Sequence, residues 1–250
     1  MFRLFKFAFK AWFIVQVMAV AFSAGMGVAY LMQLRSQYRT WGLLPGDDER
    51  GMSGDDLVPN ADVIETRFID IDAPPDEVWP WLAQLGYGRG GWYSFEAIDR
   101  PWSPGGGAMG ESADTILDEF QDLAEGDLVP THEQGGFVAR VVEPGEALVL
   151  FLDDTMVREQ VDELVADRAG EEAAEGFDME MPPYRASWAF TLEDRPGDRT
   201  RLMERLRFEV EASDAQMKAR PLLELGVFML MRSQMEGIKQ RAEGAVVIEG

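Results

Sequence analysis

The alternation of hydrophobic and polar positions predicts strands in two parts of the chain. Residues 62–71 (DVIETRFIDI) alternate and are rich in β-branched side chains, which is typical of a half-buried strand. After Gly126 the same pattern returns in segments separated by glycine and proline turns, and short connections of this kind build antiparallel sheets. The predicted later strands are 127–131, 137–142, 147–152, 185–192 and 200–210.

A helical period appears between these strand regions and again at the end of the chain. Pro75 fits the first turn of a helix whose apolar face is Val78, Trp81, Leu82 and Leu85 and which ends at Gly86. Short helices are predicted at 93–99 and 115–123. A long helix is predicted at 214–244, and its middle, 222–231, is apolar nearly all round, which indicates burial on more than one side.

Segregation of strands and helices in this order favours an α+β fold over a parallel α/β fold. The acidic stretch 153–183 interrupts the strand series. Val157, Val161, Leu164 and Val165 predict a helix in it, which is either a lid over the sheet or an exposed insertion.

The first 41 residues differ sharply from the rest, because they combine a basic tail with an uncharged run. Residues 11–34 (AWFIVQVMAVAFSAGMGVAYLMQL) would span roughly 36 Å as a helix, enough to cross a bilayer. We therefore expect a single-pass membrane protein of the cell membrane. A cleaved signal peptide is the alternative, although the apolar run is longer than such a peptide needs. Basic residues flank both ends almost equally, so the positive-inside rule favours neither orientation.

Small residues recur every four positions in this run, at Ala19, Ser23 and Gly27. Helices approach one another closely along such a ridge. The ridge predicts a homodimer or another membrane protein as a partner. The following segment, 42–60, is rich in Gly, Pro and Asp without a sustained period and is interpreted as a linker, so the folded domain is expected at 61–244, followed by a tail at 245–250.

Charge and composition exclude several classes of function. The net charge is −22, although the first 46 residues contain five basic residues and no acid, so the body of the chain repels nucleic acid. Without cysteine there is no disulfide, thiolate nucleophile or zinc ribbon. His132 is the only histidine, so a His-rich metal site is excluded. We predict no metal and no cofactor.

Several local patterns are candidate sites. Residues 86–91 (GYGRGG) have the spacing G-x-G-x-x-G, but a helix precedes them where a dinucleotide site requires a strand, so a tight turn is the better interpretation. His132 lies in a turn-like context typical of a surface residue. Arg89 and Arg140 are surface ion-pair formers or, if inward, binders of an acidic group. Glu204 and Arg205 point to opposite faces of their strand, so one of them faces inward.

Five segments carry a resemblance to a known superfamily. They are 71–94 (IDAPPDEVWPWLAQLGYGRGGWYS), 118–130 (DEFQDLAEGDLVP), 187–193 (SWAFTLE), 200–207 (TRLMERLR) and 237–244 (GIKQRAEG). Together they resemble the SRPBCC, or START-like, superfamily, most closely a branch of uncharacterised bacterial members grouped with polyketide cyclases and lipid-transport proteins. The resemblance implies a helix-grip fold, in which a curved antiparallel sheet wraps around the C-terminal helix and leaves an apolar cavity between them.

This resemblance implies a membrane-anchored protein that binds a hydrophobic small molecule or lipid. Two alternatives stay open: a cyclase- or hydratase-like enzyme acting on a polyketide or aromatic substrate, and a structural accessory subunit of a membrane complex. No residue is predicted as catalytic, and the balance is against an enzyme. The predicted cavity residues are mainly aromatic: Trp81, Trp92, Tyr93, Phe137, Arg140, Phe151, Trp188, Phe190, Glu204 and Phe228.

Overall fold

The computed structural model describes residues 25, 30, 33, 37–47, 49–94, 112–133, 135–169, 183–210 and 214–244. The chain divides into two compact units, Met1–Thr40 and Trp41–Gly250. Most of the predicted membrane segment 11–34, with its ridge Ala19, Ser23 and Gly27, lies outside the described residues. Among the residues that are described, no helix is both long and apolar enough to span a bilayer.

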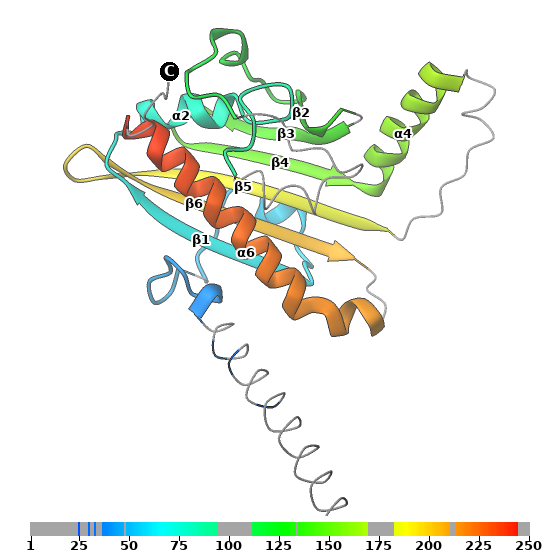
Figure 1. The fold of residues 1–250 in the computed structure, drawn as a ribbon, viewed down its shortest axis with the longest axis horizontal. Helices are drawn as coiled ribbons and strands as arrows, with labels where there is room; N and C mark the ends of the chain where they lie inside the picture. Colours follow the sequence, from blue (N-terminus) through cyan, green and yellow to red (C-terminus); the bar gives the residue numbers. More distant parts are fainter. Residues whose placement is uncertain are drawn as a thin grey trace, which may run out of the picture. The chain divides into compact units, whose positions relative to one another are not determined.

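Six antiparallel strands form one sheet in the larger unit, in the order β1-β6-β5-β4-β3-β2 (Figure 1). Short turns join β2 to β3, β3 to β4 and β5 to β6, a long insertion separates β4 from β5, and the first strand pairs with the last. The predicted α+β class with an antiparallel sheet is therefore confirmed. The strands are β1 Val63–Ile71, β2 Leu128–His132, β3 Gly135–Glu143, β4 Ala147–Asp153, β5 Tyr184–Arg195 and β6 Arg199–Val210.

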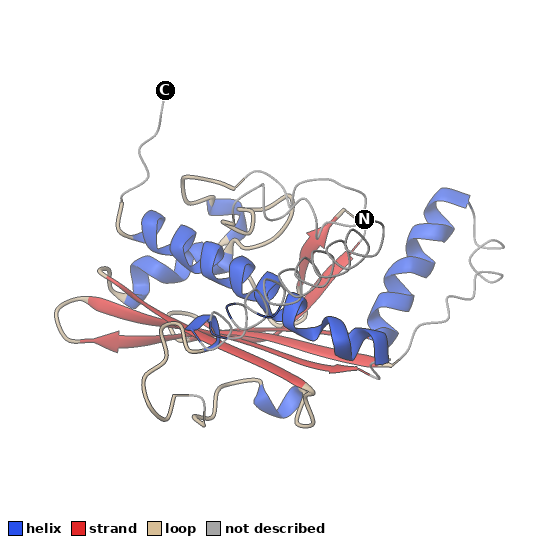
Figure 2. Ribbon diagram, turned by 60° about the horizontal axis from the view of Figure 1, so that its bottom comes forward, coloured by secondary structure: helices blue, strands red, loops and turns tan. Residues whose placement is uncertain are grey.

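Two helices pack on one face of this sheet, which we call the inner face. They are α2 (Pro75–Ala83) and α6 (Asp214–Ala242), and α6 crosses the sheet in front of β1, β6 and β5 (Figure 1). Viewed from the second direction, these helices lie on the same side of the sheet (Figure 2). Pro75 begins α2 as predicted, with Asp76 and Glu77 in its first turn, where acids complement the helix dipole.

The acidic insertion contains helix α4 (Asp154–Ala169), directly after β4. Its first turn is capped by Asp153, whose carboxylate accepts a hydrogen bond from the Met156 N–H at 2.9 Å. The Gln160 amide exchanges two hydrogen bonds with the backbone of Gly136 in β3, at 3.1 and 3.0 Å. This helix is therefore attached to the sheet through β3. The apolar positions in 153–183 had predicted a helix but not this attachment, and residues 170–182 lie outside the described part.

A segment packed on the opposite face of the sheet, which we call the outer face, changes the predicted start of the folded domain. Segment 42–60 had been interpreted as a linker, yet the compact unit begins at Trp41 and Val58 is fully buried. This segment includes the short 3-10 helix η1 (Asp55–Leu57). Arginines on the outer face of β6 hold it in place, because their guanidinium groups donate to its carbonyls and carboxylates.

Two predicted short helices differ from the structure. Only a 3-10 turn, η2 (Asp118–Phe120), lies within 115–123. Tyr93 and Ser94 are not helical, and the remainder of 93–99 lies outside the described residues. Tyr93 has φ of 57°, in the left-handed region, which interrupts a right-handed helix at its predicted start.

Candidate functional site

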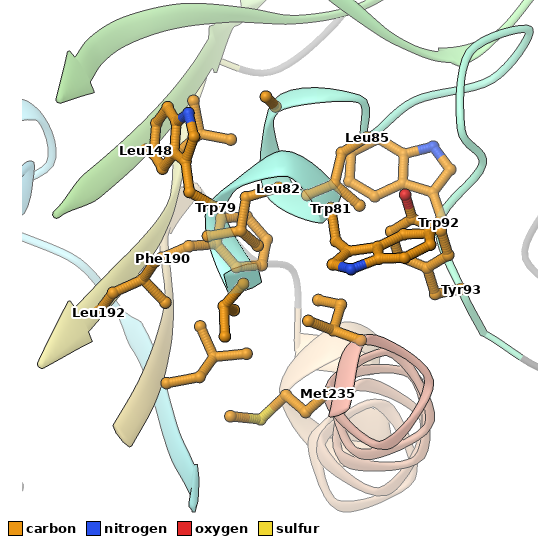
Figure 3. Packing of buried hydrophobic residues seen from close by; sticks show 14 of the residues in the cluster. Trp79, Trp81, Leu82, Leu85, Trp92, Tyr93, Leu148, Phe190, Leu192 and Met235 are labelled. Atoms are coloured by element: carbon orange, nitrogen blue, oxygen red, sulfur yellow. The ribbon is translucent and has the colours of Figure 1, made fainter. Parts of the chain in front are cut away.

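The inner face is closed at one end by a fully packed apolar cluster. Residues from α2, from the sheet and from the C-terminal half of α6 meet there, and Met235 points from α6 toward the sheet (Figure 3). Gly237 lets α6 approach closely, because a Cβ at this position would lie 2.1 Å from the Tyr93 carbonyl oxygen. The cluster includes Ile71, Trp81, Leu82, Leu148, Phe190, Leu192, Leu202, Met235 and Ile238, all less than 8% exposed.

A layer of buried polar groups follows the apolar cluster along the inner face. Glu204 of β6 is 0% exposed, and its Oε1 accepts a hydrogen bond from the Trp188 indole N–H at 2.7 Å. Trp188 also stacks on Trp92, with ring centroids 4.9 Å apart and ring planes within 4°. The second carboxyl oxygen, Oε2, has no hydrogen-bond partner within the described residues. A buried oxygen left unpaired is costly, so this atom marks a place where a partner fits.

Arg67 of β1 lies directly across from Glu204 in the strand register, but it is bonded elsewhere. Its guanidinium pairs with Glu65 at 2.6 Å and donates to the Thr66 carbonyl oxygen at 2.6 Å. Phe228 of α6 covers it, with the guanidinium carbon 5.6 Å from the ring centroid. Because both Arg67 and Glu65 are less than 4% exposed, this ion pair is part of the interior.

Burial in this layer changes the protonation of Glu204. Desolvation raises the pKa of its carboxyl from 4.5 to about 8, against the hydrogen bond from Trp188 and the charge of Arg67, which both lower it. The carboxyl therefore carries its proton at neutral pH in most molecules. A protonated carboxyl donates as well as accepts, so Glu204 presents a hydrogen-bond donor to the interior.

The other end of the inner face is apolar but incompletely covered, and we call it the open end. Pairing in register places Leu206 and Phe208 of β6 on the same face as Glu204, and both are half-buried. In α6, residues 225–230 are almost entirely apolar and also only partly buried, with Met229 43% exposed. The open end therefore leaves hydrophobic surface on the sheet and on the helix in contact with solvent.

An open pocket of about 480 Å³ lies at the tip of the sheet at this end. Tyr184 and Val210, which are paired in register, contribute inner-face side chains, and Tyr184 stacks with Phe208 at 5.8 Å. Acidic residues border the pocket, so its rim is polar while the adjoining wall is aromatic. The complete lining is Asp62, Asp154, Pro183, Tyr184, Arg185, Glu209 and Val210.

The structure brings together eight of the ten predicted cavity residues and separates two. Five of the eight belong to the packed apolar cluster, and none of the ten lines the pocket at the open end. Phe151 pairs with Ser187 and, through it, with Arg207, so its ring lies on the outer face. Arg140 is exposed and covers the Phe151 ring, 5.7 Å from its centroid. A bulge in β3 between Ala139 and Val141 displaces the alternation at this point, which the sequence does not reveal. Neither residue contributes to the inner face. The eight are Trp81, Trp92, Tyr93, Phe137, Trp188, Phe190, Glu204 and Phe228.

Several buried polar groups were not predicted from the sequence. Arg67 and Glu65 stand in a strand that was recognised, and their spacing of two residues places them on one face. Their burial depends on pairing with β6, which only the fold reveals. Gln234 on the buried side of α6 was also missed, and neither its Oε1 nor its Nε2 has a hydrogen-bond partner in the part of the chain that is described.

The glycine-rich loop, Arg89 and His132 take structural roles. Backbone N–H groups of residues 86, 87 and 89–91 all donate to backbone carbonyls, so none of these is free to hold a phosphate. Arg89 donates to the Ala83 carbonyl at the end of α2, at 2.8 Å, and its guanidinium covers Phe120. His132 lies at the end of β2 and is partly exposed. Across the residues that the structure describes, no cluster of potential ligands is suited to a metal ion.

Comparisons with known proteins identify similar folds at low identity. The chain is similar to protein MLL2253 from Mesorhizobium loti, at 16% identity and a TM-score of 0.37, covering 73% of this chain and 100% of that one. It is also similar to the Zhui aromatase/cyclase from Streptomyces sp. R1128, at 14% identity and a TM-score of 0.32, covering 75% of this chain and 98% of that one. For a START superfamily protein from Mycobacterium smegmatis the identity is 10% and the TM-score 0.29, covering 73% of this chain and 99% of that one. No known family profile and no curated protein matches the sequence.

At these identities and TM-scores the similar structures add no weight to a functional argument, and the fold stands on the chain's own topology. The antiparallel sheet begins with β1, continues through a meander and returns β6 to the side of β1. The final helix α6 then packs across the inner face against β1 and α2. This arrangement is the helix-grip fold that the START-like resemblance implies.

Proposed function

We propose that the domain holds a mainly apolar small molecule at the open end of the inner face, with the polar group of that molecule against Glu204. The observation that carries the proposal is the unpaired Oε2 of a completely buried carboxyl, adjoining apolar surface that the fold leaves partly uncovered. A ligand would bury that surface and satisfy that oxygen at once.

The open end favours a hydrophobic ligand because its walls are hydrophobic on both sides. Leu206, Phe208 and Val210 on the sheet and residues 225–230 of α6 are all only partly buried. Binding sites for small molecules are mostly apolar, with a few polar groups that fix orientation. Here Glu204, Trp188 and Arg67 are the polar groups at the inner limit of the site.

The polar layer favours a neutral head group on the ligand. Arg67 already pairs with Glu65, so its charge is not available to neutralise an incoming anion. A carboxylate ligand would also meet Glu204 and Glu65, two acidic groups in a region of low dielectric. A hydroxyl or carbonyl group accepts a hydrogen bond from the protonated Glu204 without this cost.

The proposal includes a membrane anchor at residues 11–34, as a single-pass segment of the cell membrane. Its support is the uncharged run of 24 residues and the aromatic residues near its ends. Anchoring would place the domain beside a source of apolar ligands. A homodimer or membrane-protein partner along Ala19, Ser23 and Gly27 belongs to the same proposal.

One observation favours an enzyme as a second candidate. With a pKa of about 8, Glu204 is suited to exchange a proton with a bound carbonyl near neutral pH. A cyclase- or hydratase-like reaction would use the site to orient its substrate and Glu204 as the acid. In that case Glu204→Gln would abolish turnover of a bound polyketide while its affinity changes little, whereas a binding protein shows no turnover in either form.

A neutral fluorescent probe tests the binding proposal. We expect N-phenyl-1-naphthylamine to bind the full chain with a stoichiometry of one, with a rise in probe emission and quenching of the tryptophans near the site. Phe208→Asp places a charge on the wall of the open end and should weaken binding by roughly tenfold or more.

The matched control is Ile64→Asp, which introduces the same charge in β1 on the outer face, one rung away and 45% exposed. It should leave probe affinity unchanged. Thermal unfolding of each variant establishes that it is folded before titration. Equal loss of affinity in both variants, or probe binding that never saturates, would contradict a site at the open end.

A further inference from the structure

The outer face carries an unexpected gathering of arginines at the β5–β6 hairpin. Arg195, Arg199 and Arg201 line an open pocket of about 270 Å³, together with Asp70 and Pro196. The chain as a whole has a net charge of −22, so a positively charged pocket is contrary to its general character. This pocket lies on the other side of the sheet from the site proposed above.

The strand register makes the arrangement costly. Arg195 and Arg199 face one another in the last pair of the hairpin, and like charges directly opposite each other destabilise a sheet. Arg201 lies two residues further along β6 and therefore on the same face. Three guanidinium groups consequently point to one side of the sheet within three consecutive rungs.

Nearby carboxylates neutralise this charge only in part. Arg195 pairs with Glu193 at 2.7 Å, and Arg201 pairs with Asp47 at 3.3 Å. Arg199 donates from Nε to the Pro196 carbonyl at 3.2 Å, and within the described residues no carboxylate forms an ion pair with it. Asp70 lies 3.9 Å from Arg201 Nε, but its side chain is 66% exposed and well solvated.

A buried donor on the pocket wall provides independent support. The Arg201 side chain is only 8% exposed, and among the described residues its Nε has no hydrogen-bond acceptor. Burying a donor without a partner costs free energy. An acceptor held in the pocket would remove that cost and the repulsion between Arg195 and Arg199 together.

We propose that this pocket binds a phosphate group, held by Arg195, Arg199 and Arg201. Phosphate offers several charged oxygens to several guanidinium groups, and arginine recognises it through paired N–H donors. A pocket of about 270 Å³ suits a small group more than a large ligand. The phosphate belongs either to a soluble molecule or to the head group of a membrane lipid, and the two sources can be separated experimentally.

The test uses the full chain in a neutral detergent and follows amide hydrogen exchange of residues 195–201. Titration with orthophosphate should protect these amides saturably if the source is soluble. Arg199→Gln should weaken this protection by roughly tenfold, the effect of one charge-assisted hydrogen bond. Without phosphate the same variant should unfold at a higher temperature, because the like-charge pair is gone.

Arg158→Gln is the matched control, since it makes the same charge change in α4, away from the pocket, and should not alter the protection. The second arm replaces orthophosphate with phosphatidic acid mixed into the detergent micelles. Protection in this arm alone identifies a lipid head group as the source. Protection in neither arm, or equal effects of Arg199→Gln and Arg158→Gln, would overturn the proposal.

Discussion

Buried ionisable side chains are bonded differently on the two faces of the sheet. On the outer face, Arg205 and Arg207 bond with Asp55 and with the backbone of segment 42–60. On the inner face, Glu204 keeps an unpaired oxygen within the described residues, close to apolar surface that is only half covered. The difference indicates that the outer arginines hold segment 42–60, whereas Glu204 keeps a hydrogen-bonding group that the proposed ligand would use.

Removing the inner carboxyl should have the largest effect, and it depends on pH. Below about pH 4.5 Glu204 is protonated in both states, and as pH rises the unfolded chain ionises first while the folded chain keeps its proton until about pH 8. Glu204 therefore lowers the free energy of unfolding progressively across that interval, and no further above it. Between pH 5 and 9 we expect this group to cost about 4 kcal/mol.

Glu204→Gln should remove this pH dependence of the unfolding free energy, while the Gln side chain still accepts the hydrogen bond from the Trp188 indole. The variant should therefore be more stable than the wild type at pH 9. Urea unfolding of both proteins across the pH range measures the difference. Glu119→Gln, a charge change at an exposed position, serves as the control. Parallel pH profiles for wild type and Glu204→Gln would mean that the inner carboxyl is not buried in a protonated form.

Breaking the outer arrangement should have the next largest effect. Arg205 is 3% exposed and donates to Asp55 at 2.7 Å and to Thr66 at 2.9 Å. Arg205→Met should lower the free energy of unfolding by about 3 kcal/mol, because it removes two buried charge-assisted hydrogen bonds and leaves Asp55 with only the longer bond from Arg207, at 3.3 Å. It should also speed tryptic cleavage after Arg50, in the segment that these bonds retain.

The control is Arg158→Met, which removes an arginine from a partly exposed ion pair in α4 and should cost less than about 1 kcal/mol. If Arg205→Met cost no more than this control, the outer face would not be held by its charges.

A smaller effect should follow from closing the space that segment 42–60 needs. Gly42 has φ of +76°, and a Cβ there would lie 2.0 Å from the Phe68 carbonyl oxygen in β1. Gly46 has φ of +90° with no neighbour within 4 Å, so Gly46→Ala introduces backbone strain alone. We expect Gly42→Ala to lower the unfolding free energy by about 2 kcal/mol more than Gly46→Ala. Equal losses in thermal unfolding would show that the segment has room to move.

The strands were predictable because their alternation is strict, and β6 was placed within one residue of its observed start. Gly135 and Gly136 were interpreted as a turn, yet they begin β3. Glycine is required at both positions because a Cβ there would clash with neighbouring atoms. Segment 42–60 was missed because its attachment depends on bonds from distant arginines, which leave no periodic pattern.

The site was predictable only in part for a similar reason. A period of two places either Glu204 or Arg205 inward, but it cannot choose between them or locate Arg67 opposite Glu204. That choice follows from the apolar neighbours Leu202 and Leu206, which share a face with Glu204 and pack toward α6. The β3 bulge similarly removes Arg140 from the aromatic residues with which it had been grouped, and the regular pairing of β4 with β5 places Phe151 on the outer face.

The most direct test of the central claim, that the open end holds an apolar molecule, is native mass spectrometry of the full chain purified from cells in mild detergent. We predict an added mass corresponding to one neutral apolar compound per chain, retained by Ile64→Asp and absent from Phe208→Asp. Wild-type protein of unchanged mass that also fails to bind the neutral probe would contradict the account.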